Sequence, residues 1–429
     1  MTDLTETLLT RIKDHRLPGL DLGDDFIYPN YQGLSILNTP STICTVLGAE
    51  PLPSPTLAPE IMQAIGGSTK KVILILMDAL ALHRLQAWMQ ADESLVWNRL
   101  AEQGLLAPLT SITPSTTSAA ITTYWTGAPP AQHGIGGYEQ WLREYGIIAN
   151  MIEHKPITYR GRGGEMSIAG FDPQSFLPVS PIGPHLAGQG ISIHSFQHFS
   201  IIHSGLSKMF MDRADLHPFS TAADLMISLR DFIEAHKSEK LYTWVYWSHV
   251  DGLSHFHGPD SERPRQEFTL FSQAFERLFL DQLSPQARKD TLVILTADHG
   301  QITTNNLDRH YDLGNHPGLM RRLHFQPTGE NRLPYLYVKP GQIEAVREYI
   351  ERTWPGQFTL LESAYALENG LFGPGVPYEA FADRIGDLTV LAKGNAYWWW
   401  GNKENFLIGR HGGLHAEEML VPFLAAKLG

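Results

Sequence analysis

Several features that would assign the chain to other classes of protein are scarce or missing from its 429 residues. Cys44 is the only cysteine, which excludes an intrachain disulfide framework and a zinc site built from several thiolates. No run of about 18 apolar residues occurs, so the sequence predicts no membrane span. The first residues lack a basic region followed by an apolar stretch, so we expect no signal peptide and a cytoplasmic location.

Positive charge is also in short supply. Asp and Glu exceed Lys and Arg and give a formal net charge of −12. We therefore expect neither a nucleic-acid polymer nor an anionic membrane as a partner. Hydrophobic residues make up 43% of the chain and charged residues only 18%, a composition that supports a large folded core. If the substrate is a phosphate ester, bound cations must offset the negative field. The oligomeric state has no signature in this sequence.

Strands and helices alternate along most of the chain. Continuous apolar runs predict buried strands over 72–77, 106–112, 241–247 and 291–296. Helical patterns are predicted over 82–103, 118–126, 222–236 and 263–283. Further strands are expected over 333–338 and 387–391, with helices over 342–353 and 363–369. This rhythm predicts an α/β fold, with a mainly parallel central sheet and helices on both faces.

Two regions depart from this rhythm. Residues 1–70 are rich in Pro, Leu and turn residues, and we expect them to wrap the core as an N-terminal segment. Residues 141–218 are crowded with Gly, Pro and Ser and are predicted to form an inserted, loop-rich cap. Because loops carry binding residues, the cap is expected to choose the substrate.

Side chains that bind hard metal ions follow the predicted strands directly: Asp78, Asp251, His255, Asp298 and His299. Open α/β sheets bind ligands at the carboxyl ends of their strands, so these side chains are expected to meet. Asp251 and His255 can face one ion if a turn of helix follows the strand. The neighbours Asp298 and His299 can share an ion only if the backbone turns sharply, and Gly300 provides that freedom. A late histidine, His411, stands before Gly412.

Thr117 stands at the start of a predicted helix, shortly after Pro114. Free amides at a helix start bind anions, and a hydroxyl there becomes a nucleophile when a metal lowers its pKa. An N-cap threonine is the alternative interpretation. Carboxylate and imidazole ligands without thiolate suit zinc, manganese or iron, and a hydrolytic zinc pair is the first expectation, with manganese as the alternative. Two cations roughly 4 Å apart can hold both oxygens of an in-line phosphoryl displacement.

In combination these motifs resemble the alkaline phosphatase superfamily, and within it the type I phosphodiesterase/nucleotide pyrophosphatase branch. The similarity covers residues 70–300 and 405–425 and rests on these motifs: a strand ending in Asp78, Pro114-Ser115-Thr116-Thr117, Thr126-Gly127, His133-Gly134, Asp251 with His255, Asp298-His299-Gly300 and His411-Gly412. It implies an alkaline-phosphatase-like catalytic domain over 71–429.

The resemblance also implies a division of the ligands between two metals. One metal would be held by Asp251, His255 and His411. The other would be held by Asp78, Asp298 and His299. Thr117 would be the nucleophile and a further ligand of that second metal.

The chain departs from the family pattern in places. Nucleotide pyrophosphatases carry an asparagine that contacts a phosphoryl oxygen, and this chain reads Ile135-Gly136-Gly137-Tyr138 there. His415 lies close to His411 and is an alternative late ligand. The surroundings of Cys44 lack the C-x-P-x-R signature, which excludes a formylglycine sulfatase. Thr116, rather than an Asp, precedes the nucleophile, and this favours a diester over a monoester.

The sequence therefore predicts a metal-dependent phosphoester hydrolase of the phosphodiesterase/nucleotide pyrophosphatase type, acting on a small-molecule substrate. A phosphonate hydrolase or phosphomonoesterase with the same site is an alternative. A phosphomutase of the same fold is another. A binding protein that kept the ligands without catalysis is the third.

Several other side chains are candidates for smaller roles. His194, His198 and His203, four and five residues apart, are candidates for a third metal site. A substrate or supporting role in the pocket is conceivable for these residues: His249 beside Asp251, His310, His316, the run Trp398-Trp399-Trp400, Arg160, Arg162, Arg321 and Arg322. The ordinary alternatives are core packing for the tryptophans and solvation for the arginines.

Overall fold

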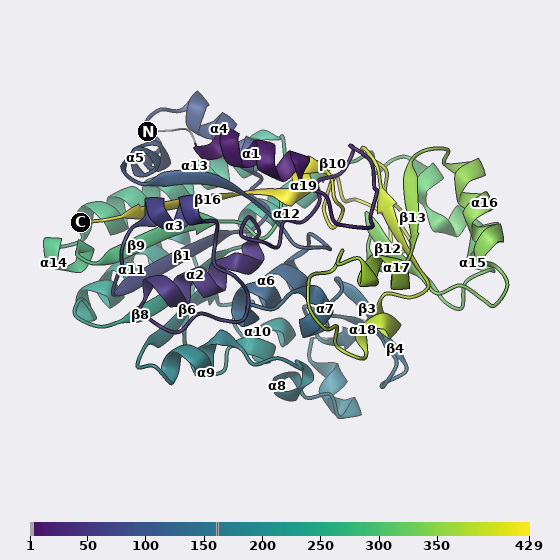
Figure 1. Ribbon diagram of the computed structural model, residues 1–429, viewed down its shortest axis with the longest axis horizontal. Helices are drawn as coiled ribbons and strands as arrows, with labels where there is room; N and C mark the ends of the chain where they lie inside the picture. Colours follow the sequence, from purple (N-terminus) through teal and green to yellow (C-terminus); the bar gives the residue numbers. More distant parts are fainter. Residues whose placement is uncertain (1–3, 160, 162) are drawn as a thin grey trace.

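The apolar runs form the middle of a seven-stranded sheet in the computed structural model, which describes residues 4–159, 161 and 163–429 (Figure 1). Across the sheet the strands are β2 (Leu105–Thr110), β16 (Leu420–Lys427), β9 (Thr291–Thr296), β1 (Lys71–Met77), β8 (Leu241–Trp247), β6 (Ser192–His198) and β7 (Ala214–Phe219). Neighbours from β9 to β7 pair in parallel, whereas β16 runs antiparallel to both β2 and β9. The predicted mainly parallel central sheet is confirmed.

The register of the three central strands brings their carboxyl ends to one edge. Every residue of β1, β8 and β9 is buried, as expected of strands that helices cover on both faces. Met77 pairs with Trp247, and Leu76 pairs with Thr296. The residues that follow these three strands therefore emerge side by side.

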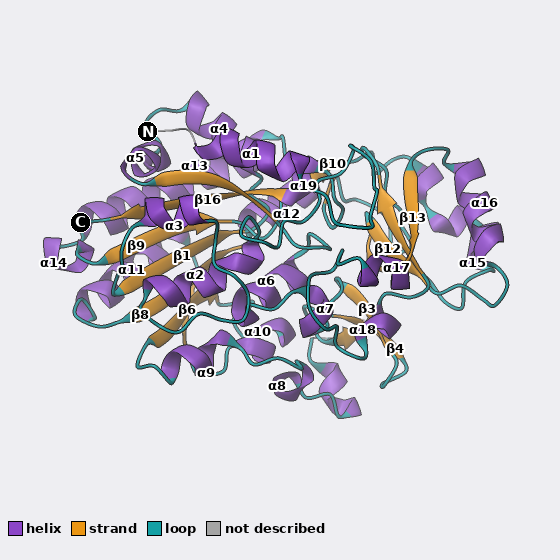
Figure 2. Cartoon of the chain, in the orientation of Figure 1, coloured by secondary structure: helices purple, strands orange, loops and turns teal. Residues whose placement is uncertain are grey.

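Helices lie on both sides of this sheet (Figure 2). They include α1 (Leu4–Asp14), α2 (Thr39–Val46), α3 (Pro59–Ile65), α4 (Leu82–Ala91), α5 (Val96–Gln103), α6 (Thr117–Thr126), α9 (Ile182–Ala187), α10 (Gly205–Phe210), α11 (Ala222–Ala235), α12 (His249–His257), α13 (Glu262–Ala274) and α14 (Pro285–Arg288). The prediction of one helix over 82–103 is wrong. Asp92 breaks it, because its carboxylate accepts from the backbone N–H of Ser94 at 3.0 Å and turns the chain. The helix predicted over 263–283 ends as α13 at Ala274, and a π turn over Phe275–Phe279 follows.

A second, antiparallel sheet lies beside the first, on the right in Figure 1. Its strands, in order, are β13 (Phe358–Glu362), β14 (Leu388–Ala392), β12 (Leu333–Leu336), β11 (Thr328–Glu330), β3 (Glu139–Leu142), β4 (Ile147–Asn150) and β5 (Lys155–Pro156). It carries the helices α15 (Pro317–Met320), α16 (Ile343–Thr353), α17 (Ser363–Glu368) and α18 (Phe381–Arg384). The strands predicted over 333–338 and 387–391 belong here and not to the parallel sheet. A core of its own, centred on Trp354 and Trp398, holds them.

The segment predicted as a cap, 141–218, contributes to both sheets. Its first part supplies half of β3 together with β4 and β5, and its last part supplies β6 and nearly all of β7 of the central sheet. The helices α8 (Pro173–Phe176) and α9 lie between β5 and β6, and α10 lies between β6 and β7. Arg160 and Arg162 lie outside the described residues.

Residues before β1 pack along one margin of the central sheet. The hydroxyl of Thr5 donates to the carbonyl of Leu106 at 2.8 Å, and the N–H of Thr110 donates to the carbonyl of Leu34 at 2.8 Å. Across the sheet, a short ribbon of β10 (Ile302–Thr303) and β15 (Gly409–Arg410) joins the loop after β9 to the chain just before His411. This ribbon carries the late histidine to the edge where β1, β8 and β9 end.

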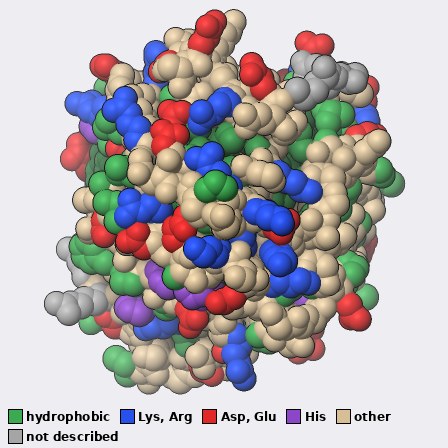
Figure 3. Space-filling view, turned by 90° about the vertical axis from the view of Figure 1, so that its left-hand side faces the viewer, with side chains coloured by type: hydrophobic (Ala, Val, Ile, Leu, Met, Phe, Trp, Pro, Cys, Tyr) green, Lys and Arg blue, Asp and Glu red, His purple; other side chains and the backbone are tan. Residues whose placement is uncertain are grey.

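Basic side chains gather over the middle of the end of the molecule that lies opposite the second sheet, with acidic side chains among them and toward the margins (Figure 3). Among the residues that the structure describes, we find no helix with the length and apolar character needed to cross a bilayer.

Candidate active site

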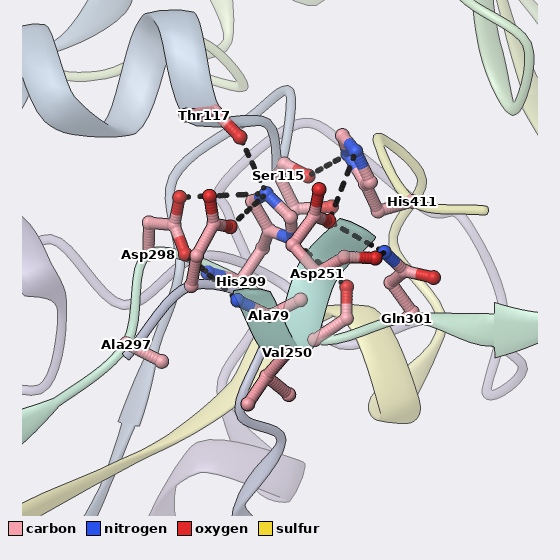
Figure 4. Close-up of polar contacts among 12 residues, drawn as sticks. Ala79, Ser115, Thr117, Val250, Asp251, Ala297, Asp298, His299, Gln301 and His411 are labelled. Carbon is pink, nitrogen blue, oxygen red and sulfur yellow. Dashed lines mark hydrogen bonds and ion pairs between the residues drawn. The ribbon is translucent and has the colours of Figure 1, made fainter. Parts of the chain in front are cut away.

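The structure gathers the predicted ligands at the carboxyl edge of the central sheet (Figure 4). They form two groups, and within each group the ligand atoms lie within 4.8 Å of one another. The first group is Asp251, His255 and His411, and the second is Asp78, Asp298 and His299. Asp78 follows β1, Asp251 and His255 lie on the helix α12 after β8, Asp298 and His299 follow β9, and His411 follows β15.

The second group is fully enclosed. His299 Nε2 lies 3.6 Å from Asp78 Oδ1 and 3.5 Å from Asp298 Oδ2, and all three side chains are buried. Thr117, the first residue of α6, places its Oγ1 3.1 Å from the same nitrogen. A hydroxyl group and two carboxylates thus converge on one imidazole nitrogen.

The first group is half-buried and adjoins the second. His255 Nε2 lies 3.4 Å from Asp251 Oδ1, and His411 Nε2 lies 4.0 Å from the same oxygen. The rings of His411 and His299 stack at 3.9 Å between centroids. The two groups therefore form one continuous centre.

Backbone carbonyls set the tautomer of all three histidines. The Nδ1 atoms of His299, His255 and His411 lie 3.0, 2.8 and 3.2 Å from the carbonyl oxygens of Gly300, Gly409 and Ser115. A carbonyl only accepts hydrogen bonds, so each Nδ1 carries a proton, and Nε2 is the nitrogen that offers a lone pair when the ring is neutral. These lone pairs face carboxylate oxygens, an arrangement that a cation between them would stabilise.

Two carboxylate oxygens of the centre have no hydrogen-bond partner: Asp78 Oδ1 and Asp298 Oδ2. Burial, together with the charges of Asp298 and Asp251, raises the pKa of Asp78 well above its usual value, and burial raises the pKa of Asp298. Burial and the neighbouring His299 and His255 lower the pKa of His411 well below its usual value. The donor set of unpaired carboxylate oxygens and neutral imidazoles fits two divalent cations.

A family comparison identifies the chain. The model of the family described as type I phosphodiesterase / nucleotide pyrophosphatase matches residues 72–414. The chain belongs to this family. It is accordingly a hydrolytic enzyme of the class that acts on phosphoester or phosphonate bonds, and the family depends on divalent metals.

Solved structures of similar fold include two kinds of enzyme. Murine ectonucleotide pyrophosphatase / phosphodiesterase 5 superposes with a TM-score of 0.60 at 15% identity, over 83% of this chain and 88% of the murine chain. Phosphonoacetate hydrolase from Sinorhizobium meliloti 1021, in complex with phosphonoformate, gives a TM-score of 0.60 at 17% identity, over 83% and 90% of the two chains. At these identities the likeness establishes a shared fold. A search of curated protein sequences found no significant match.

Three supporting contacts in this phosphodiesterase-family site went unpredicted. Tyr246, on β8, donates a short hydrogen bond to Asp78 Oδ2, and the amide of Gln301 donates to Asp251 Oδ1. The N–H of Ala79 donates to Asp298 Oδ1 at 3.2 Å from a left-handed backbone conformation, φ 62°, that non-glycine residues rarely adopt. The sequence offers one signal for these three residues, which is their closeness to a predicted ligand. Ala79 and Gln301 stand within two residues of one, and Tyr246 lies on the strand that precedes Asp251.

His411 and His415, the two candidates for the late ligand, lie in different surroundings. His411 belongs to the first group, and Ser115 holds its loop by accepting from His411 Nδ1 and by donating its hydroxyl to Gly413 O at 2.6 Å. His415 instead caps the short helix α19 (Ala416–Met419), where its Nδ1 accepts from the N–H of Glu417 at 3.3 Å.

Other predicted candidates lie outside the centre. His310 and His316 pack around Trp354 in the second sheet, 5.6 and 4.5 Å away between ring centroids, and Trp398 is buried in the same core. His249 packs against Trp247 and His198.

Tyr138 and Glu330 are in contact in the stretch where nucleotide pyrophosphatases carry an asparagine. The N–H of Tyr138 donates to the carboxyl group of Glu330 at 2.8 Å. Glu330, on β11, is buried, also hydrogen-bonds to the side chain of Thr116, and lies so close to Gly412 that a Cβ there would approach Glu330 Cβ to 2.4 Å.

Proposed function

We propose that the protein is a metal-dependent phosphodiesterase with Thr117 as its nucleophile. The observation that supports this best is the 3.1 Å separation between Thr117 Oγ1 and the unprotonated Nε2 of His299. It places the hydroxyl beside the enclosed cation group and at the start of α6, where free backbone N–H groups can bind a phosphoryl oxygen.

Two cations complete the proposed site. Asp251, His255 and His411 would hold one, and Asp78, Asp298 and His299 would hold the other, with Thr117 as an additional ligand. Zinc is the first expectation from nitrogen and oxygen donors, and manganese is the alternative. When bound, such ions polarise a phosphoryl oxygen and lower the pKa of a coordinated hydroxyl group.

The residues then act in two steps. Thr117 loses its proton to solvent, and its Oγ1 attacks phosphorus in line as the bond to the leaving alcohol oxygen breaks. The leaving oxygen takes up a proton, and a phosphothreonine remains. Water then attacks phosphorus in line with Oγ1, from the side that the leaving alcohol vacated, and loses a proton to solvent. The bond to Oγ1 breaks, and Oγ1 takes up a proton, which restores the hydroxyl of Thr117. Amides at the start of α6 stabilise the charge on the phosphoryl oxygens in both steps.

A diester substrate is favoured because Thr116, and not an acidic residue, precedes the nucleophile. A phosphonate substrate is the second candidate. The observation that favours it is the arrangement of Tyr138 and Glu330 where nucleotide pyrophosphatases carry asparagine, together with the fold shared with phosphonoacetate hydrolase.

The test is a turnover panel of chromogenic esters with zinc and with manganese. It contains bis-p-nitrophenyl phosphate, p-nitrophenyl phosphate, a p-nitrophenyl phosphonate ester and p-nitrophenyl sulfate. We expect the diester to be the best substrate, the Thr117→Ala variant to lose turnover by about 1000-fold or more, and Thr117→Ser to retain a measurable part of it. Full diester turnover by Thr117→Ala would rule out the covalent step.

Two rival functions give other outcomes. A phosphomutase would isomerise a sugar phosphate without releasing phosphate or alcohol. A binding protein would hold clearly less than one equivalent of metal and gain no turnover when zinc or manganese is added.

A further inference from the structure

A group of polar side chains lies on one face of β6 and β7, the last two strands at one edge of the central sheet. His194 comes from β6, and Asp215 and His217 come from the edge strand β7. His194 pairs with Asp215 in the parallel register, and His217 is two residues further along β7. Residues two apart on a strand point to the same face, so all three side chains share one side of the sheet.

This group is separate from the catalytic centre. His194 pairs with Thr243 of β8, four residues before the end of that strand at Trp247. At a rise of about 3.3 Å per residue, the group lies about 13 Å back from the edge that carries the proposed cation site. None of its members contributes to the proposed chemistry.

The spacing of the two histidine nitrogens is that of metal ligands, whereas Asp215 Oδ2 lies close to His194 alone. His194 Nδ1 lies 3.2 Å from His217 Nε2 and 3.7 Å from Asp215 Oδ2. Tetrahedral zinc, with Zn–N bonds of about 2.05 Å, separates two of its nitrogen ligands by about 3.3 Å. The nitrogens of the two imidazoles already face each other at this distance.

We propose that His194, His217 and Asp215 bind a transition-metal ion such as Zn²⁺ at the edge of the central sheet. The ion replaces the proton that the two facing nitrogens share, and His217 takes the tautomer with its proton on Nδ1. Asp215, whose side chain is 79% exposed, turns from solvent to complete three protein ligands, and water fills the fourth position.

The surroundings support the two histidine positions. Ser192 Oγ lies 3.1 Å from His194 Nε2. In the proposed metal-bound form Nε2 carries the proton and donates it to this hydroxyl oxygen, so Nδ1 keeps its lone pair for the ion. Phe196 stacks on His217 at 4.4 Å, and Phe232 of α11 packs on His194 at 4.3 Å, so both rings are held in place. His236, 6.0 Å from His194 between ring centroids, is the nearest further imidazole.

The sequence spacing indicated a different metal site, made of His194, His198 and His203. His198 instead hydrogen-bonds to Ser200 and packs beside His249 at the other end of β6. The partners of His194 come from the neighbouring strand, so only the folded sheet reveals the group.

The ion would join β6 to β7 through their side chains. Because β7 is the edge strand of the sheet, the expected consequence is a more stable edge and not a change in catalysis.

The decisive measurement is the amount of zinc bound per chain. The full-length protein is stripped with a chelator, equilibrated with Zn²⁺, desalted and analysed for metal. We expect His217→Ala to bind one zinc fewer than the parent while turning over its ester substrate at the parent rate. His185→Ala, which removes a surface histidine bonded to the carbonyl of Glu50, serves as the matched control and should bind as much zinc as the parent.

A crystal of the parent soaked in zinc gives a second, independent readout. An anomalous-scattering peak between His194 Nδ1 and His217 Nε2 supports the site, and it does so even if His217→Ala fails to fold. Equal zinc content in the parent and in folded His217→Ala, or no peak between the two nitrogens, overturns the proposal. Neither result depends on whether the catalytic centre hydrolyses esters.

Discussion

Arg332 and Glu418 form an ion pair in which both side chains are completely buried. The Nε and Nη2 atoms of Arg332 donate to the two carboxylate oxygens at 2.8 Å each. Glu418 also accepts from the N–H of Gly413 through Oε1, and from the N–H of Gly300 through its carbonyl, both at 2.8 Å. These two glycines follow the late histidine and the Asp298–His299 pair. The ion pair thus ties the second sheet to the loop that carries His411, and the backbone of Glu418 holds the loop that carries Asp298 and His299.

Glu418→Gln should weaken metal binding even though it touches no metal ligand. The variant keeps the shape of the side chain but leaves the guanidinium of Arg332 buried without its counter-charge, which we expect to cost about 3–5 kcal/mol of unfolding free energy. The single amide oxygen of the variant has to serve both Arg332 and the N–H of Gly413, and this weaker loop contact should lower metal affinity by about 10- to 100-fold. Urea unfolding and a chelator competition assay measure the two effects.

A double variant separates positioning from stability. Arg332→Met with Glu418→Leu replaces the ion pair with apolar side chains and should recover most of the stability while metal affinity stays low. Glu144→Gln is the matched control, because Glu144 pairs with Arg384 at 3.0 Å elsewhere in the second sheet region. Parent-like metal affinity in the double variant would show that Glu418 does not position the loops.

Gln301→Leu should weaken the half-buried cation group selectively. Gln301 is fully buried and its amide orients Asp251, so the apolar variant frees that carboxylate to turn away from His255. We expect about a tenfold loss of affinity for one of the two ions and little change for the other. Calorimetric titration of the metal-free protein with zinc measures the two affinities separately. Gln357→Leu, which removes the amide that accepts from Tyr311, should leave both affinities unchanged.

His411 and His415 should respond differently to alanine. His411→Ala removes a donor from the first cation group, so the variant should bind one ion fewer than the parent and lose turnover. His415→Ala removes only the cap of α19 and should cost about 1 kcal/mol of stability with metal content intact. Metal analysis of the two variants decides which histidine is the ligand, and the opposite pattern would assign His415.

Glu330 should make the stability of the metal-free protein fall as the pH rises. Burial raises the pKa of Glu330 to about 8, above the ordinary value of 4.5. Between these pH values the folded chain holds a proton that the unfolded chain has released, so the free energy of unfolding decreases by up to about 1.4 kcal/mol per pH unit. Glu330→Gln has no such proton, and its urea-unfolding profile should be flatter between pH 4.5 and 8. Parallel profiles for the two proteins would contradict this assignment.

Much of the central sheet could be predicted because its signals are local. A strand buried on both faces requires a continuous apolar run, and β1, β8 and β9 each show one, with a carboxylate soon after it. Thr117 was recognisable from its place at a helix start. The grouping of His411 with Asp251 had no local signal, since 160 residues separate them, and it came from the resemblance to the family.

The second sheet could not be predicted in the same way. It combines two stretches far apart in the sequence, and some of its strands are very short, such as Thr328–Glu330 and Lys155–Pro156. Such strands have too few residues to show an alternating pattern. The buried contacts of Tyr246, Gln301 and Glu418 are single polar residues, whose partners only the fold defines.

The position of β16 has a consequence for biosynthesis. A ribosome releases Leu420–Lys427 after every other strand, yet this segment fills the gap between β2 and β9. Until β16 has been synthesised, β2 and β9 each have an edge whose backbone groups lack a strand partner. The central sheet therefore becomes continuous only after His411 and β16 have been synthesised, and the unpaired edges of β2 and β9 are open to wrong pairing and to chaperone binding until then.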